Sequence, residues 1–151
     1  MSTAADTQNG FTLLEIMLVV IILSILAAIA IPRLAGSADM AREKADITTG
    51  KELKAALDRY QLENGSYPSL VESEDDDGKV TGAGFIPAYI KKLDKTVTQQ
   101  NVPAEKQGFG IATGENPLTT NLIMIYLVAD GSSAEVKVFH KDLSTELWSS
   151  E

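Results

Sequence analysis

The sequence contains no cysteine, one histidine and one tryptophan. Without cysteine, no disulfide can close a loop or staple the fold. The single histidine, His140, has no serine or cysteine nucleophile pattern beside it, so a surface position on a strand explains it better than catalysis does. Neither a zinc-ligand pattern nor a nucleotide-binding motif occurs in the chain. The sequence therefore predicts no enzyme activity, no cofactor and no metal site.

Basic residues are absent from the first 32 positions, and all 13 Lys and Arg follow Pro32, as do 19 of the 21 acidic residues. The part of the chain after Pro32 therefore has a formal charge of −6. This charge disfavours direct nucleic-acid binding through a basic groove. Internal repeats and long loop-like stretches are also missing, so the 151 residues indicate one soluble domain beside any membrane segment.

The longest apolar run extends from Phe11 to Ile31, 21 residues that include one charged side chain, Glu15. At about 1.5 Å of helical rise per residue, this run reaches about 30 Å, the thickness of the hydrocarbon core of a bilayer. It is therefore predicted to be a transmembrane helix. A charged side chain in such a helix costs roughly 2.5 to 3.5 kcal/mol, so Glu15 is expected to need a partner.

The residues around this carboxylate resemble a known signal. Gly10, then Phe11-Thr12-Leu13-Leu14-Glu15, then an apolar helix closed by Pro32, is similar to the start of type IV pilins and of the pseudopilins of type II secretion and DNA uptake. The resemblance implies that a membrane peptidase cuts between Gly10 and Phe11 and that Phe11 is then N-methylated. It also implies that Glu15 guides subunits into a homo-oligomeric helical filament. An inner-membrane platform and a cytoplasmic ATPase would supply the work of assembly.

Cleavage before Phe11 would create an α-amine, largely protonated at neutral pH, where an uncharged peptide bond stood before. Glu15 follows one helical turn later, so the amine of the same chain or of a neighbour could pair with it. Processing would then permit assembly. The alternative is that Glu15 snorkels to the lipid head groups near the end of the helix.

Residues 1–10 are small and polar, as expected of a cleaved leader. Leaders of this family normally carry Lys or Arg, whereas here Arg33 follows the span, so the positive-inside rule alone would point the N-terminus outward. The resemblance favours a cytoplasmic N-terminus, and a misassigned start codon or an unusual lineage would explain the missing charge. An ordinary secretory signal with a cleavage box at residues 28–30 is the rival interpretation, but it lacks a basic n-region.

Beyond Pro32 the helical pattern continues. Apolar residues recur at steps of three and four among charged ones, which predicts an amphipathic helix; they are Leu34, Ala38, Ala41, Ala45, Leu53, Ala56, Leu57 and Tyr60. Pro32 removes one backbone hydrogen bond and is expected to kink or locally melt the helix, with Gly36 and Gly50 as candidate assisting positions. The helix is expected to end by Asn64-Gly65, within a segment (residues 53–68) similar to the helix exit of many pilins and major pseudopilins.

An acidic run occupies residues 72–77. Its carboxylates could bind Ca²⁺, which some major pseudopilins use nearby in the fold, but the spacing does not match an EF-hand loop. A solvated surface loop is the better interpretation, and the sequence leaves calcium open. Residues 85–93 could add a short helical turn or an edge segment.

The C-terminal third predicts an antiparallel meander. Its expected strands are residues 109–113, 122–128 and 136–140 and a last short strand containing Leu147 and Trp148, with a turn at residues 130–133. The uninterrupted apolar run at residues 122–128 favours a central strand. Tyr60 and Tyr67 are expected to pack the helix against the loop that follows it.

Together these features predict an α+β pilin fold with a leader (1–10), a transmembrane or filament-core helix (11–32), an amphipathic helical half (33–65) and a head (66–151). The expected protein is a structural subunit of a type IV pilus-like filament. Its precursor would span the inner membrane with the N-terminus in the cytoplasm and would end in an extracellular pilus. The alternatives are a periplasmic pseudopilus of secretion or DNA uptake and, further off, an uncleaved single-span binding protein. Major or minor status, adhesion target, retraction and glycosylation stay open.

Overall fold

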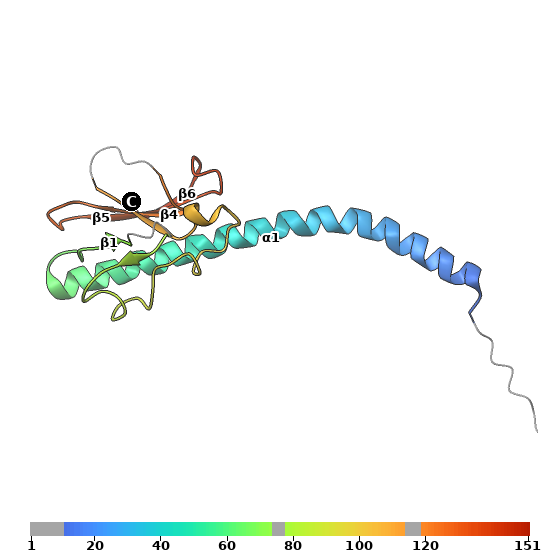
Figure 1. Ribbon diagram of the computed structural model, residues 1–151, viewed down its shortest axis with the longest axis horizontal. Coiled ribbons are helices and arrows are strands. Elements are labelled where there is room, and N and C mark those ends of the chain that lie inside the picture. Colours follow the sequence, from blue (N-terminus) through green and yellow to red (C-terminus); the bar gives the residue numbers. More distant parts are fainter. Residues whose placement is uncertain (1–10, 74–77, 114–118) are drawn as a thin grey trace, which may run out of the picture. The chain divides into compact units, whose positions relative to one another are not determined.

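The computed structural model describes residues 11–73, 78–113 and 119–151 (Figure 1). The chain divides into two compact units, Met1–Ala38 and Asp39–Glu151. Helix α1 (Leu13–Asn64) contributes to both, and the six strands found among the described residues belong to the second unit, the head. The expected α+β fold, with a long N-terminal helix and a small sheet, is confirmed.

Helix α1 is 52 residues long and ends where the sequence predicts. Gly65 follows it with φ +84°, and the Gly65 N–H donates to the Gln61 carbonyl at 2.7 Å, the left-handed C-cap that glycine adopts without steric cost. Pro32 lies inside α1, and the helix continues on both sides of it without local melting. The kink expected at Pro32 stays a prediction.

The main sheet of the head has the order β3-β4-β5-β6. Its strands are β3 (Phe109–Ala112), β4 (Ile123–Leu127), β5 (Ala134–Phe139) and β6 (Glu146–Ser149). Strands β4, β5 and β6 form the predicted antiparallel meander, and β6 contains Leu147 and Trp148 as expected. The placement of β4 inside the sheet is also confirmed.

The predicted antiparallel pairing of the first strand is wrong. Strand β3 pairs with β4 in parallel, with Phe109 opposite Ile123 and Ala112 opposite Tyr126. A parallel neighbour requires a crossover that returns the chain to the same end of the sheet, whereas a tight turn produces an antiparallel pair. Residues 113–122 lie between the two strands, too many for a tight hairpin turn.

A small hairpin, absent from the sequence-based expectation, covers the free edge of β3. Strands β1 (Val71–Glu72) and β2 (Val80–Thr81) pair antiparallel. The Phe109 N–H donates to the Gly78 carbonyl at 2.9 Å, and the Ile111 N–H donates to the Glu72 carboxylate. These bonds satisfy edge groups that could otherwise pair with another strand.

The connector between β2 and β3 lies against the helix. Residues 85–93 form turns that end in an isolated bridge between Val80 and Leu93, and the short 3₁₀ helix η1 (Ala104–Lys106) follows. Tyr60 of α1 meets Phe85 and Tyr89 edge to face, with ring centroids 5.8 and 5.1 Å apart. Tyr60 is therefore a packing residue as predicted, but the ring partners shown lie in this connector and not in the loop that directly follows the helix.

The core of the head lies between α1, the connector and one face of the main sheet. Its fully buried large side chains come from all three elements: Leu53, Leu57, Phe85, Leu93, Phe109, Leu122, Ile123, Ile125, Val136 and Val138. Leu34, which the sequence pattern placed on the same stripe, is 72% exposed. Within the described part of α1, buried residues begin at Asp46.

Asp46 is a buried carboxylate that the sequence pattern did not reveal. It is fully buried on α1 and accepts the Gln99 N–H at 2.7 Å and the Gln100 N–H at 3.1 Å. Burial raises the pKa of Asp46 above its ordinary value, and the two backbone bonds oppose that rise. Through this carboxylate, the connector is hydrogen-bonded to the helix.

Candidate functional site

The first turn of α1 is closed by a reciprocal pair of residues. The Thr12 backbone N–H donates to the Glu15 carboxylate at 3.2 Å, and the Glu15 N–H donates to the Thr12 hydroxyl oxygen at 3.2 Å. This arrangement is a capping box, in which Thr at the N-cap and Glu three residues later satisfy each other's backbone donors. The pattern Thr-x-x-Glu before an apolar run would have revealed it in the sequence.

The capping box gives the lone carboxylate of the apolar segment a polar environment. In the described part of the chain, the hydrogen-bond partners of the Glu15 side chain are the Thr12 N–H and, at 3.4 Å, the Thr12 hydroxyl. No cation lies within ion-pair distance of Glu15 among these residues. The carboxylate is therefore hydrogen-bonded but has no counter-charge among the described residues.

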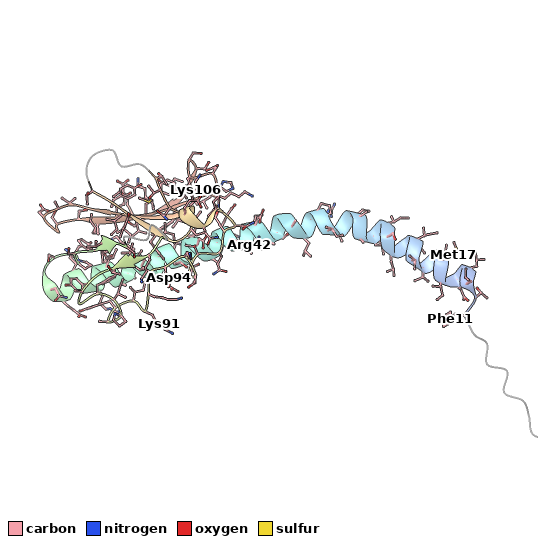
Figure 2. All side chains as sticks on the ribbon, viewed as in Figure 1. Phe11, Met17, Arg42, Lys91, Asp94 and Lys106 are labelled. Atoms are coloured by element: carbon pink, nitrogen blue, oxygen red, sulfur yellow. The ribbon has the colours of Figure 1, made fainter. Side chains whose placement is uncertain are left out.

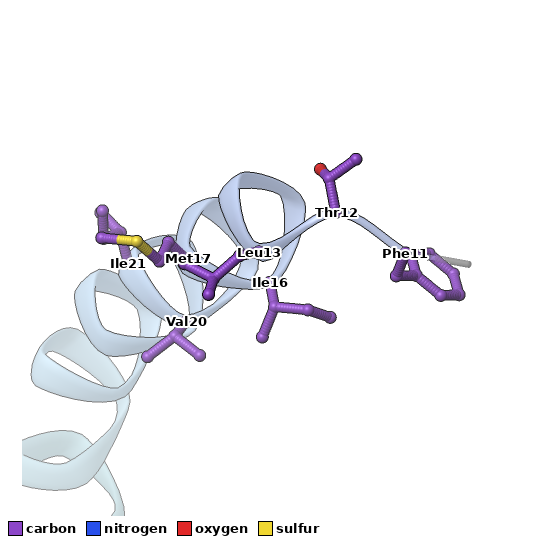
Figure 3. Close-up of a pocket in the computed structure, with 7 residues that line it drawn as sticks. All are labelled: Phe11, Thr12, Leu13, Ile16, Met17, Val20 and Ile21. Carbon is purple, nitrogen blue, oxygen red and sulfur yellow. The ribbon is translucent and has the colours of Figure 1, made fainter. Parts of the chain in front are cut away.

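Apolar side chains surround the capping box. Phe11 precedes the helix and is 82% exposed, and a shallow pocket beside it is lined by residues of the first helical turns (Figure 3). These lining residues are Phe11, Thr12, Leu13, Ile16, Met17, Val20 and Ile21. Large apolar side chains remain exposed along the helix as far as Met40, and Figure 2 shows Phe11 and Met17 projecting outward.

This exposure is far beyond what a water-soluble surface carries. Every described residue of the N-terminal unit is exposed, and the most apolar window of α1 has a mean hydropathy of 3.0. Among the described residues, α1 is the one helix long and apolar enough to cross a membrane. The segment is suited to a lipid environment or to the helices of other subunits.

The predicted site residues fall in one region of the chain. Phe11 lies outside the helix, Glu15 lies in its first turn and Pro32 lies within it. Gly10, the predicted residue before the cut, lies outside the described residues. What the sequence reasoning missed was Thr12, which binds both the backbone and the carboxylate of Glu15.

The head offers no comparable chemical centre in its described residues. His140 lies 3.4 Å from Glu43 and 3.0 Å from Asp142, and its side chain is 28% exposed. No group of three or more His, Asp and Glu side chains with metal-binding geometry occurs among the described residues. In the acidic run, the Glu72 carboxylate accepts the Ile111 N–H of β3, and residues 74–77 lie outside the described residues.

Comparison with known proteins points to one family. The model of the prokaryotic N-terminal methylation motif matches residues 6–31. The type II secretion system core protein G of Escherichia coli (strain K12) is 32% identical over 105 residues, which cover 70% of this chain and 70% of that protein. No solved structure matches the chain.

Two further relatives match more closely over a shorter stretch. Type II secretion system core protein G of Pseudomonas aeruginosa is 51% identical over 65 residues, and that of Vibrio cholerae is 47% identical over 62 residues. Each match covers 41% of this chain, and the matches cover 44% and 42% of the two relatives. The chain thus spans less than half the length of these two relatives.

Proposed function

The chain belongs to the pilin and pseudopilin family that includes type II secretion system core protein G, and we propose that it is a filament subunit of a periplasmic pseudopilus. Subunits would be held in the inner membrane by the apolar part of α1 and then transferred into a helical homopolymer. The head would lie on the outside of the filament. The relatives favour this role over the surface pilus that the sequence alone favoured.

The observation that carries the proposal is the combination of an exposed apolar helix with one capped carboxylate in its first turn. An apolar helix used only as a tether has no need of a charge, and a charge in the bilayer is costly. A later state that supplies a counter-charge would offset the cost of retaining Glu15 inside this segment. A filament of processed subunits supplies one in each α-amine.

Processing is proposed to remove residues 1–10 by cleavage after Gly10 and to methylate the new amine of Phe11. The methylation-motif match over residues 6–31 supports this assignment. Phe11 and Thr12 precede the first residue of α1, so the chain directly after the proposed cut lies outside the helix. A prepilin peptidase and methylase are therefore the first partners we propose, and the inner-membrane platform with its ATPase comes next.

In the filament, Glu15 is proposed to pair with the α-amine of Phe11 from its own chain or from a neighbour. The Thr12 N–H holds the carboxylate at the helix start, one turn from that amine. A protonated amine would convert a hydrogen-bonded but uncompensated charge into an ion pair, and such pairing is most valuable where water is excluded.

Mass spectrometry of the membrane-extracted protein tests the assignment directly. The expected mature chain begins at Phe11 and carries one added methyl group. In a Gly10→Val variant, the side chain would block the peptidase site, so full-length precursor should accumulate in the membrane. An intact leader in the wild type would contradict the proposal and favour an uncleaved, single-span anchored binding protein.

Gene neighbourhood separates the two filament types. An adjacent outer-membrane secretion channel would support the pseudopilus, and an adjacent retraction ATPase would support a surface pilus. The absence of cysteine is compatible with both.

A further inference from the structure

The last helical residue, Asn64, is followed directly by Gly65, and both are exposed. An Asn-Gly pair is the sequence in which the asparagine side chain is most open to attack by the next backbone nitrogen, because glycine has no Cβ to hinder it. A Cβ built on Gly65 would meet no atom within 4 Å beyond its own chain neighbours and helix. Packing therefore does not shield this pair.

Hydrogen bonds hold the two reacting groups apart. The Asn64 side-chain amide donates to the Tyr60 carbonyl at 2.9 Å and to the Tyr89 hydroxyl at 3.4 Å. The Gly65 N–H donates to the Gln61 carbonyl at 2.7 Å. Each of these bonds belongs to the last turn of α1 or to its contact with the connector, and helix ends open at little free-energy cost.

We propose that Asn64-Gly65 is a site of spontaneous deamidation that becomes reactive when the last turn of α1 opens. The Gly65 backbone nitrogen forms a bond to Asn64 Cγ and gives up its proton, and the Cγ–Nδ2 bond breaks with release of ammonia. Water then opens the cyclic imide at either carbonyl. The products are aspartate and isoaspartate, and the overall change is one water consumed and one ammonia released.

The modification removes a donor and adds a negative charge. The Tyr60 carbonyl and the Tyr89 hydroxyl both lose the Asn64 amide, and the new carboxylate follows Glu63, whose own carboxylate accepts the Tyr89 hydroxyl. Isoaspartate also lengthens the backbone at the position where Gly65 makes its C-cap. Modified chains should therefore have a looser contact between the helix end and the connector.

Peptide mapping by mass spectrometry tests the proposal on the full chain in detergent micelles, incubated in heavy-oxygen water at mildly alkaline pH. The expected result is labelled aspartate and isoaspartate at position 64 that accumulate with time. Asn121, which is buried and bonded to the Gln107 carbonyl, should remain intact. Asn101, exposed but followed by Val102, is the matched exposed control and should also remain intact.

Two variants separate the chemistry from a general loss of structure. Gly65→Ala should slow the reaction by about tenfold, because a Cβ crowds the attacking nitrogen, even though alanine strains the cap and opens the helix end more often. Tyr89→Phe, which removes one acceptor of the Asn64 amide, should accelerate the reaction severalfold. An unmodified Asn64 in the folded chain, or modification that Gly65→Ala leaves equally fast, would overturn the proposal.

Discussion

Gly50 of helix α1 lies so close to Val138 of strand β5 that a Cβ built on the glycine would stand 2.5 Å from the valine Cγ2. Two atoms of the Trp148 ring would lie 3.3 and 3.4 Å from the same Cβ. The lack of a side chain at Gly50 therefore allows helix α1 to pack close to the sheet. The sequence pattern alone indicates only a role in assisting a kink.

Gly50→Ala is expected to destabilise the head. Alanine is favoured over glycine in a helix by about 1 kcal/mol, but overpacking a rigid core costs typically 1 to 3 kcal/mol. Val138 is fully buried and β-branched, so it cannot move aside. The cost of the steric clash should therefore exceed the gain in helix propensity. Denaturant unfolding of the full chain in micelles measures the difference.

A double variant controls for this effect. Val138→Ala removes the atom that alanine at position 50 would strike, so adding Gly50→Ala to the Val138→Ala background should cost much less than it does in the wild type. Equal costs in the two backgrounds would show that the close approach is not what requires glycine.

Replacing Asp46 tests whether its hydrogen bonds to the connector stabilise the head. Asp46→Ala leaves the N–H groups of Gln99 and Gln100 without their acceptor, and each buried unpaired donor costs about 1 to 3 kcal/mol. Asp46→Asn keeps one acceptor oxygen and should be milder. Denaturant unfolding measures both changes. An Asp46→Ala protein as stable as the wild type would show that these hydrogen bonds do not stabilise the head.

The contribution of Asp46 to the stability of the head should change with pH in a definite direction. Burial raises its pKa in the folded head, so the folded state binds the proton more tightly than the unfolded state. The resulting stabilisation grows as the pH falls through the folded-state pKa and is complete below the unfolded value of about 3.9. Relative to Asp46→Asn, the wild type should therefore gain stability as the pH falls from neutral toward 4.

The comparison with Asp46→Asn is needed because other carboxylates act in the opposite direction. Hydrogen bonds donated by the Thr145 and Ser144 N–H groups lower the pKa of Asp142, so its contribution to stability is lost as the pH falls. If the wild type instead lost stability relative to Asp46→Asn on acidification, the two backbone bonds would outweigh burial.

Thr12 is expected to fix the start of α1. Thr12→Val removes the hydroxyl that accepts the Glu15 N–H, and loss of an N-cap costs about 0.5 to 2 kcal/mol of local helix stability. The Glu15 amide should then exchange its hydrogen about two- to thirtyfold faster in micelles. Thr12→Ser keeps the hydroxyl and should exchange like the wild type. Equal protection in all three proteins would exclude a capping role.

The head should fold without the membrane segment. The second compact unit begins at Asp39, and it contains all six strands and every buried residue that the structure describes. A chain lacking residues 1–38 is expected to be soluble and monomeric and to unfold cooperatively, as calorimetry and sedimentation would record. Aggregation or a broad, gradual transition would place the boundary elsewhere.

The sequence predicted the elements whose signal is local. Three- and four-residue spacing gave the length of α1, Gly65 gave its end, and the apolar run in β4 gave the central strand. The parallel partnership of β3 was not predictable in this way, because strand direction depends on where the crossover delivers the chain.

The functional and buried polar residues were recognised less completely than the helix and strands. Glu15 was recognised because a charge in an apolar run is conspicuous, whereas its partner Thr12 was overlooked although the capping pattern is local. Asp46 could not have been recognised, because its partner Gln99 lies 53 positions away and a charged residue on an amphipathic helix normally faces solvent.

In the proposed filament, Glu15 supplies the counter-charge for a processed α-amine. Glu15→Gln tests the charge alone, because glutamine also serves in a capping box and should keep the bond to the Thr12 N–H. Glu15→Leu removes both the charge and the cap. Both variants make the helix easier to hold in the bilayer, so membrane insertion and cleavage should be retained.

The decisive measurement is the yield of assembled filament from cells that produce only Glu15→Gln, together with the amount of processed subunit in their membranes. We expect full processing and almost no filament, because leaving one member of a buried ion pair uncompensated costs on the order of 3 to 5 kcal/mol. Partial incorporation is expected when wild-type subunits are also present. Wild-type filament yield from the variant alone would contradict the pairing and leave Glu15 as a residue that snorkels to the lipid head groups.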